Sequence, residues 1–494
     1  MDTVSNENTI ELPSSDVLRQ NYIYNTLLTV LFQLFNVFTL PWVARIFGPE
    51  LLGTVQYGFT IAMYFLLPLI QGIPFFTIRE ISKVRDDPVE MNKVFSELFF
   101  LNFLFVTGAM MIYGVLLLMV DKLRSELLLY LVIGLVLVTN FLNIRWLFQA
   151  LEKYKEITIG TLVVVAVSVA LVYAFVNQPE HYILFSVFWV LATGGVNFVY
   201  FLFGSRHVKI RMSVSWEAVK RLKGMGIIVF TFVVIDLYVY FDTILLGAFV
   251  GDYYVGLYAP VMRILDVMLI VLLSLNVVIL PRLSYYVKKG MKEAYGNLAR
   301  FSLQYVYILA PALVLFFFIL APSLIEVLAG PGYEGSVLAL QVIIPILLVI
   351  GLGSFFGFQI LMSQDDEEDK LFITAVCGLV TSVVLNLLLI PEYRHIGAAY
   401  VRLVTELVIL SGHFIFAYKY LNFRAVPSWQ NIIGLGLLTI ALVVVRTFVA
   451  EPILTIVLGI LLGLVVYVGS LLVLKEELVT HLVRSLKEKY LQKG

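Results

Sequence analysis

Long apolar segments follow one another along nearly the whole chain, and they constrain its fold more than any other feature. Runs of about 20 residues recur from Tyr22 onward, and each can cross a hydrocarbon core about 30 Å thick. Such runs must be helical, because lipid satisfies no backbone hydrogen bonds. Only 14% of the 494 residues are charged, against about 25% in soluble proteins. The sequence therefore predicts an all-α polytopic membrane protein.

The apolar runs divide into about fourteen predicted transmembrane spans. We place these spans at about 21–46, 51–78, 95–120, 126–150, 156–177, 181–204, 225–250, 254–281, 301–329, 335–362, 371–391, 395–420, 431–450 and 452–474. Lys and Arg gather in the loops after spans two, six and eight and in the C-terminal tail. This positive-inside bias predicts that both termini are cytoplasmic. We also expect the protein to lie in the cytoplasmic membrane of the cell.

Two short stretches indicate an internal repeat. "FGPELLG" holds Gly48 and Gly53, and "VGDYYVG" holds Gly251 and Gly256, at an offset of 203 residues. The repeat would relate spans 1–6 to spans 7–12 by an axis along the membrane normal, a plan that some transporters use. The alternative is that tight outer turns favour glycine in any case.

The repeat leads to predicted domain boundaries. They are a cytoplasmic N-terminal tail at 1–20, an N-lobe at 21–204, an inter-lobe cytoplasmic loop at 205–224, a C-lobe at 225–420, two extra helices at 431–474 and a cytoplasmic tail at 475–494. The last two spans fall outside the repeat and are predicted additions to the two six-helix lobes.

Several motifs resemble one known family. They are "LPWVARIFGPELLGTVQYGF" (40–59), "GIPFFTIREISKVRDD" (72–87), "NIRWLFQALEKYKEI" (143–157) and "FDTILLGAFVGDYYVGLYAPVMRI" (241–264). In these stretches the chain is similar to polysaccharide flippases of the Wzx type, which belong to a superfamily with the MATE antiporters and the lipid II flippases. Ala150 is a mild departure from the family's span-four pattern, and Arg145 is less expected there and particular to this branch.

The resemblance implies a function. Flippases of this type move polyprenyl-pyrophosphate-linked glycans across the membrane by alternating access, alongside a polysaccharide polymerase or export machinery. It also implies that the last two spans cradle the lipid tail. We therefore expect a lipid-linked glycan and membrane lipid as partners, and no cofactor.

Charged residues inside the predicted spans are candidates for the transport path, since each costs about 2.5–3.5 kcal/mol to insert. The predicted phosphate-binding residues are Arg263, Arg402, Arg79 and Arg145, and the predicted lumen carboxylates are Asp236, Asp242, Asp266 and Glu406. The planar guanidinium of arginine suits phosphate oxygens and stays charged in a low dielectric. The carboxylates would then hold the arginines in the absence of substrate, or couple transport to an ion.

Depth along the helices predicts how these charges pair. Asp242 and Arg263 lie at similar depth on either side of an outer turn, and Asp266 shares the Arg263 face. Arg402 and Glu406 share a face at i and i+4. Other interpretations stay open: the pairs can be structural, Arg145 can extend to the headgroups, and Arg79 can be a positive-inside anchor.

Some function classes are disfavoured by the sequence. Lys and Arg balance Asp and Glu at 34 each, so bulk charge does not favour nucleic acid. The sequence holds no Walker A motif, no metal-ligand spacing and no convincing catalytic set, and its short outer loops argue against a membrane glycosyltransferase or glycan polymerase. The protein is therefore expected not to be an enzyme. A MATE-like antiporter, with Asp236 or Asp242 binding H⁺ or Na⁺, remains the main alternative.

Overall fold

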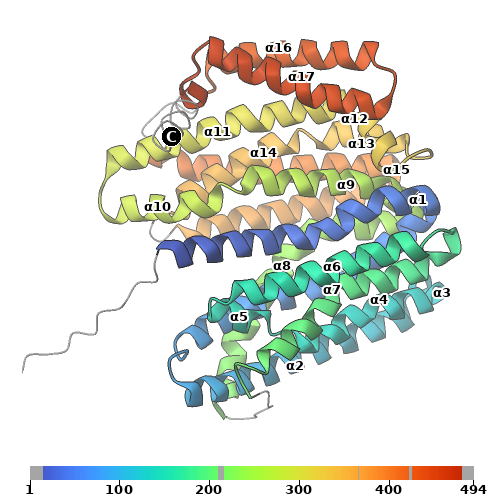
Figure 1. Ribbon diagram of the computed structural model, residues 1–494, viewed down its shortest axis with the longest axis vertical. Coiled ribbons are helices and arrows are strands. Elements are labelled where there is room, and N and C mark those ends of the chain that lie inside the picture. Colours follow the sequence, from blue (N-terminus) through green and yellow to red (C-terminus); the bar gives the residue numbers. More distant parts are fainter. Residues whose placement is uncertain (1–14, 210–215, 365–366, 422–425, 481–494) are drawn as a thin grey trace, which may run out of the picture. The chain divides into compact units, whose positions relative to one another are not determined.

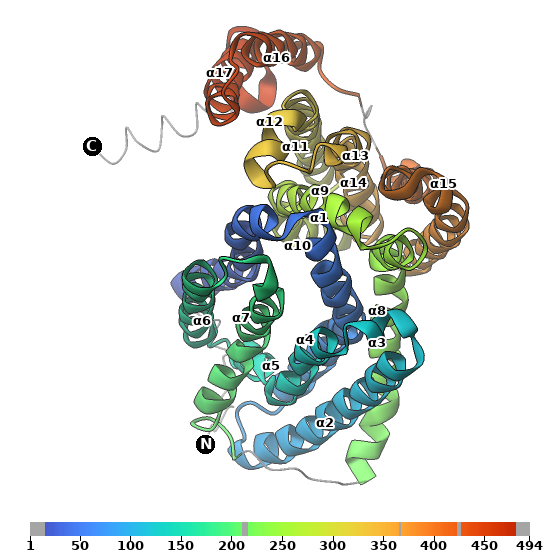
Figure 2. The same ribbon diagram turned by 90° about the vertical axis from the view of Figure 1, so that its right-hand side faces the viewer.

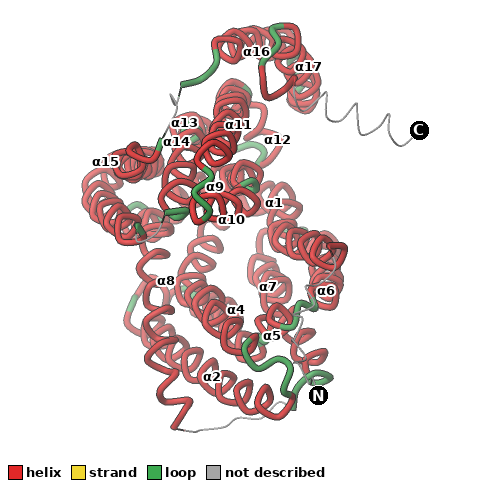
Figure 3. The backbone as a smooth tube through the Cα atoms, turned by 90° about the vertical axis from the view of Figure 1, so that its left-hand side faces the viewer, coloured by secondary structure: helices red, strands yellow, loops and turns green. Residues whose placement is uncertain are grey.

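A computed structural model of the protein describes residues 15–209, 216–364, 367–421 and 426–480. Within this part of the chain, all regular structure is helical, as Figure 3 shows. Eleven of these helices are long and apolar enough to cross a membrane. The prediction of an all-α polytopic membrane protein is therefore confirmed.

The predicted count of fourteen spans is not confirmed by these eleven helices. Two long helices each contain a pair of predicted spans: α1 (Ser15–Ser82) is kinked at Gly48, and α15 (Glu368–Ala417) is kinked at Arg394. Their backbone leaves the helical region at these residues, with φ, ψ of 67°, 177° at Gly48 and 57°, −135° at Arg394. Counting each of these helices once gives fewer than fourteen, so the count stays a prediction.

The chain folds into two compact units. Unit 1 contains the described residues of 15–38, 62–176 and 183–233, and unit 2 contains those of 39–61, 177–182 and 234–480. Because α1 and α8 (Trp216–Phe249) each run through both units, these units are not the predicted lobes. The predicted boundaries at 204 and 225 therefore stay a prediction.

Unit 1 consists of helices around an aromatic core. Besides parts of α1 and α8, its elements are α2 (Pro88–Met119), α3 (Asp121–Ser125), α4 (Leu127–Thr139), η1 (Asn140–Leu142), α5 (Arg145–Ala150), α6 (Tyr154–Phe175) and α7 (Tyr182–Gly204). Phe95 and Trp146 pack with their ring centroids 5.3 Å apart in the core. Asp87 caps α2 by accepting hydrogen bonds from the backbone N–H groups of Val89 and Glu90, and proline at N1 suits a helix start.

The predicted fourth span is broken rather than continuous. Between α4 and α5 the chain passes through η1 and two non-helical residues. Side chains form hydrogen bonds at the break: Asn143 Nδ2 donates to Asn140 Oδ1 at 2.9 Å, and Trp146 Nε1 donates to the Asn143 carbonyl at 3.0 Å. A break at membrane depth is tolerated because it is buried in protein.

Unit 2 contains the rest of the chain. Its elements after α8 are α9 (Asp252–Leu273), α10 (Asn276–Lys288), α11 (Lys292–Ile319), α12 (Ala321–Leu328), α13 (Gly335–Ile343), α14 (Ile346–Ser354), the π-helical turn η3 (Phe355–Leu361), α15, η4 (Tyr418–Tyr420), α16 (Trp429–Phe448) and α17 (Pro452–Val473). It also holds the short turn η2 (Pro179–His181).

The helices α16 and α17 pack side by side along α11 and α12, at the red end of the ribbon in Figures 1 and 2. Polar groups fix this packing: Asn431 Nδ2 donates to the Tyr307 carbonyl at 2.7 Å, and the Tyr467 hydroxyl donates to Asn431 Oδ1 at 2.6 Å. Arg446 Nη1 donates to the Ile319 carbonyl at 3.0 Å. These two helices therefore form a defined layer of unit 2.

The two glycine-containing turns pack directly against each other within unit 2. A Cβ added at Gly53 would lie 1.8 Å from the Asp252 carbonyl oxygen, and one added at Gly256 would lie 1.8 Å from the Pro49 carbonyl oxygen. The Thr54 hydroxyl also donates to Asp252 Oδ2 at 2.8 Å. Each turn thus contacts the other's backbone at positions that are 203 residues apart in the sequence, and the repeat that this offset suggests stays a prediction.

A carboxylate joins the two ends of α15. Glu367, just before the helix, accepts hydrogen bonds from Lys370 Nζ, from the Tyr420 hydroxyl at 2.5 Å and from Lys419 Nζ at 3.2 Å. These hydrogen bonds lower the pKa of Glu367 to about 2, and the one from Lys370 has the largest effect. The carboxylate is therefore stabilised in the folded state.

We expect this cluster to make stability depend on pH. A lowered carboxyl pKa contributes stability above the ordinary value of 4.5, and the contribution is lost as pH falls toward about 2. In detergent at pH 6, Glu367→Gln should have a lower thermal unfolding midpoint than wild type. Between pH 5 and pH 3, the midpoint of the variant should fall by less than that of wild type. Equal losses in both proteins over that range would contradict the expectation.

Candidate functional site

A cluster of charged side chains lies where α8, α9 and α15 pack in unit 2. We call this the charged cluster, and its members are Asp242, Tyr258, Arg263, Asp266, Arg402 and Glu406. Asp242 of α8 is 3% exposed. Its Oδ2 accepts a hydrogen bond from the Tyr258 hydroxyl of α9 at 3.0 Å, and its Oδ1 accepts one from the Thr243 backbone N–H at 2.6 Å.

Arg263 and Asp266 form an ion pair along α9. Arg263 Nη1 lies 3.6 Å from Asp266 Oδ2, and the Arg263 side chain is 20% exposed. Of the two partners predicted for Arg263, the structure places Asp266 in ion-pair contact. The Asp266 side chain is 43% exposed, so an incoming anion can reach Arg263 and take the place of the carboxylate.

Arg402 occupies the buried side of the charged cluster. Its Nε lies 4.0 Å from Glu406 Oε1, and both side chains are close to 10% exposed. Arg402 also interacts electrostatically with Asp242, Asp266 and Tyr258. One buried guanidinium therefore faces carboxylates from three helices.

The described cluster contains three carboxyl groups and two guanidinium groups, which gives a formal charge of one unit negative when all five are ionised. Both arginines are held by carboxylates, and each carboxylate could release its arginine to an incoming anion. Such an arrangement can bind a phosphate by exchange of partners, or a cation on a carboxylate. The protein groups support either chemistry.

The other predicted site residues are not part of the charged cluster. Arg145 and Arg79 belong to unit 1, where Arg145 interacts electrostatically with Tyr154 and Tyr200, and Arg79 has a 75% exposed side chain. The Asp236 side chain lies outside the described residues. The functional roles assigned to all of these residues stay predictions.

Sequence reasoning missed Tyr258. A hydroxyl within an apolar span needs a hydrogen-bond partner when it is buried, and Tyr258 is 1% exposed. Tyr258 follows the turn at Gly251 by about as many residues as Asp242 precedes it, so equal depth could have suggested the pair. The ion pairs of Arg221, described below, were also missed.

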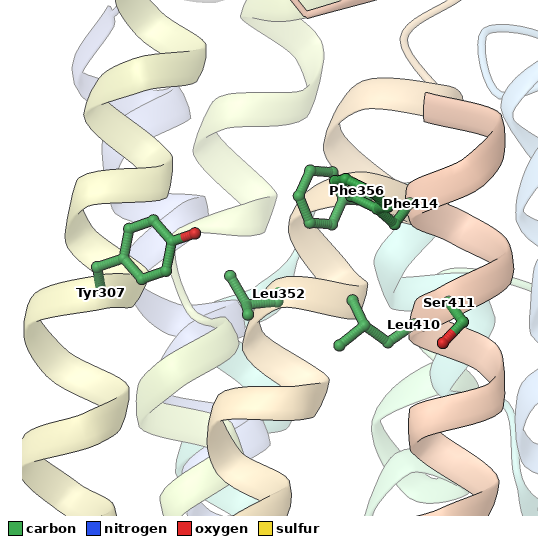
Figure 4. Close-up of a pocket in the computed structure, with 6 residues that line it drawn as sticks. All are labelled: Tyr307, Leu352, Phe356, Leu410, Ser411 and Phe414. Carbon is green, nitrogen blue, oxygen red and sulfur yellow. The ribbon is translucent and has the colours of Figure 1, made fainter. Parts of the chain in front are cut away.

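An apolar cavity lies elsewhere in unit 2. It has a volume of about 290 Å³ and lies between α11, α14, η3 and α15 (Figure 4). Its lining residues are Tyr307, Leu352, Phe356, Leu410, Ser411 and Phe414. None of these belongs to the charged cluster, and the cavity offers few polar groups to a sugar or a phosphate.

No group of three or more His, Cys, Asp or Glu side chains that could hold a metal ion occurs among the described residues. A bundle of apolar helices in which arginines and carboxylates pair at membrane depth is typical of polytopic membrane transporters. The chain belongs to the polysaccharide biosynthesis protein family, whose model matches residues 18–287.

Similar proteins agree with this membership. The chain is 24% identical to the "Putative O-antigen transporter" of Escherichia coli (strain K12) over 396 residues, which cover 80% of this chain and 95% of that protein. These relatives are transporters rather than enzymes.

Solved structures share the fold. The "Lipid II flippase MurJ, inward closed conformation" matches with a TM-score of 0.71 at 12% identity, covering 93% of this chain and all of that one. An inward-facing MATE multidrug transporter of the MOP superfamily matches with a TM-score of 0.64 at 14% identity, covering 80% and 97%. The chain therefore has the fold of MOP-superfamily transporters.

Proposed function

We propose that the protein is a flippase that moves polyprenyl-pyrophosphate-linked oligosaccharide units across the cytoplasmic membrane for cell-surface polysaccharide synthesis. Family membership and the O-antigen transporter relative support the substrate class. The observation that carries the proposal is the charged cluster, in which Arg263 and Arg402 are held by carboxylates at membrane depth. Transport would proceed by alternating access, with both termini cytoplasmic and a polymerase or export machinery receiving the product.

The charged cluster suits the pyrophosphate of such a substrate. The exposed Arg263–Asp266 pair can exchange its carboxylate for a phosphate oxygen, because a guanidinium binds both groups through the same bidentate geometry. Arg402, being more buried, would supply positive potential without leaving Glu406. Arg263 is therefore the first contact we assign to the phosphate.

A flipping assay in proteoliposomes tests this role. The substrate is a polyprenyl-pyrophosphate oligosaccharide, and its exposure to an external sugar-modifying enzyme reports flipping. Losing a charge-assisted hydrogen bond of about 1.5–3 kcal/mol should lower the initial rate in Arg263→Gln roughly tenfold or more. Arg446→Gln is the matched control, since it removes a guanidinium from unit 2 outside the charged cluster.

The antiporter alternative has one observation in its favour, the excess of carboxylates in the charged cluster. It makes an opposite forecast in the same vesicles. Wild type would leave the lipid-linked glycan unflipped and would instead exchange small cations against a proton or sodium gradient, with loss of exchange in Asp242→Asn. Full flipping in Arg263→Gln, beside normal wild-type flipping, would remove Arg263 from the site without changing the proposed function.

A further inference from the structure

A second cluster of charges lies in unit 1, where α1 ends and α2 and α8 begin. Its members are Arg79, Glu80, Lys83, Glu97 and Arg221. The Glu80 carboxylate lies at its centre: Oε1 is 2.5 Å from Lys83 Nζ and 4.0 Å from Arg79 Nε, and Oε2 is 3.9 Å from Arg221 Nε. Arg79 of α1, Lys83 just after α1 and Arg221 of α8 thus share one carboxylate.

Glu97 fixes the position of Arg221. This residue of α2 is fully buried, and its Oε2 lies 3.2 Å from Arg221 Nη1. Removing one member of a buried ion pair costs several kcal/mol, so the contact with Glu97 keeps Arg221 on the protein side. The α1 and α8 backbones approach closely nearby, since a Cβ added at Gly72 would lie 2.7 Å from the Val229 Cα.

Glu80, in contrast, is partly exposed, with 17% of its side chain accessible, and two of its three cations are open to solvent. The Arg79 side chain is 75% exposed and that of Lys83 is 54% exposed. With three cations and two carboxylates, the five side chains carry one net positive charge. A pre-positioned arginine, two exposed cations and one replaceable carboxylate together make an anion site that the chain's own Glu80 occupies.

We propose that Arg79, Lys83 and Arg221 bind the phosphate of a lipid at this end of unit 1, and that Glu80 is a built-in competitor which the phosphate displaces. The inference rests on the proposed function, because the expected ligand is the pyrophosphate of the lipid-linked glycan. The positive-inside prediction places this end on the cytoplasmic side, where such a substrate is loaded. Glu97 keeps Arg221 in place while Glu80 leaves.

Binding measurements test the competition directly. The probes are geranylgeranyl pyrophosphate and inorganic pyrophosphate, titrated into the full chain in nanodiscs made of zwitterionic lipid or of 30% anionic phospholipid, with tryptophan fluorescence as readout. Glu80→Gln should bind geranylgeranyl pyrophosphate at least about threefold more tightly than wild type, because its neutral amide no longer competes with the phosphate for the three cations. Arg79→Gln should bind it more weakly by a similar factor.

The matched control is Glu90→Gln. Glu90 is a carboxylate at the same end of unit 1 that pairs with a lysine three residues away, Lys93, at 3.5 Å. The Glu90→Gln variant should leave the dissociation constant for geranylgeranyl pyrophosphate unchanged. Both Glu80→Gln and Arg79→Gln alter side chains that keep the buried Glu97–Arg221 pair intact, so both variants should fold.

The outcomes separate the sources of phosphate. Tighter binding in Glu80→Gln in zwitterionic nanodiscs supports the site as one for the pyrophosphate lipid. Loss of that gain in anionic nanodiscs would overturn the substrate assignment and make bulk phospholipid the occupant. Unchanged or weaker binding in Glu80→Gln, beside normal wild-type binding and flipping, would overturn the inference alone. Absence of both binding and flipping in wild type would instead reject the proposed function.

Discussion

Replacing Arg402 with methionine should lower the free energy of unfolding by about 3–5 kcal/mol, because it leaves Glu406 as a buried charge without its ion-pair partner. The Glu406 side chain is 12% exposed and lies 4.0 Å from Arg402 Nε. Thermal or denaturant unfolding of the protein in nanodiscs measures this loss. Arg263→Met is the control: its partner Asp266 is 43% exposed, so its removal should cost less than the removal of Arg402.

The double variant Arg402→Met/Glu406→Leu separates structure from transport. Removing both members of a buried ion pair is often neutral or stabilising, so most of the lost stability should return. If Arg402 supplies positive potential to a phosphate, flipping should stay reduced by roughly tenfold or more. Wild-type flipping in a stable double variant would show that this pair contributes to stability and not to transport.

Much of the fold could be predicted from the sequence because the bilayer leaves few choices. Apolar runs of sufficient length must be helices, and α16 (Trp429–Phe448) and α17 (Pro452–Val473) begin and end within a few residues of the expected spans. Glycines at Gly48 and Gly251 predicted sharp turns, and both have positive φ, at 67° and 108°. Local chemistry determines these features, so one chain is enough to find them.

Features that depend on helix pairing could not be predicted in the same way. The Tyr258 hydroxyl meets Asp242 only because α9 packs against α8 with one rotation among many. Glu97 and Arg221 are more than a hundred residues apart, and their 3.2 Å contact follows from the packing of α2 against α8. The break in the fourth span depends on Asn140 and Asn143 bonding each other, which an apolar pattern does not reveal.

The two outer turns provide the second large effect that we expect. Gly53→Ala would place a methyl group 1.8 Å from the Asp252 carbonyl oxygen, and Gly256→Ala would place one 1.8 Å from that of Pro49. Since both obstacles are backbone atoms, the turns must move apart rather than adjust a side chain. Each single variant should cost about 1–3 kcal/mol of unfolding free energy and break the Thr54–Asp252 hydrogen bond. Under the proposed function, it should also slow flipping, because the turns can no longer close.

The double variant Gly53→Ala/Gly256→Ala distinguishes a shared contact from two separate strains. Once one methyl group has separated the turns, the second enters space that is already open. The double variant should therefore cost less unfolding free energy than the sum of the two single variants. Gly436→Ala is the control, since a Cβ there meets nothing within 4 Å and alanine stabilises a helix by up to about 1 kcal/mol over glycine. Unfolding midpoints of the four variants in nanodiscs decide the matter: strictly additive costs would mean that the glycines act independently, and absent costs that the turns do not meet in the membrane.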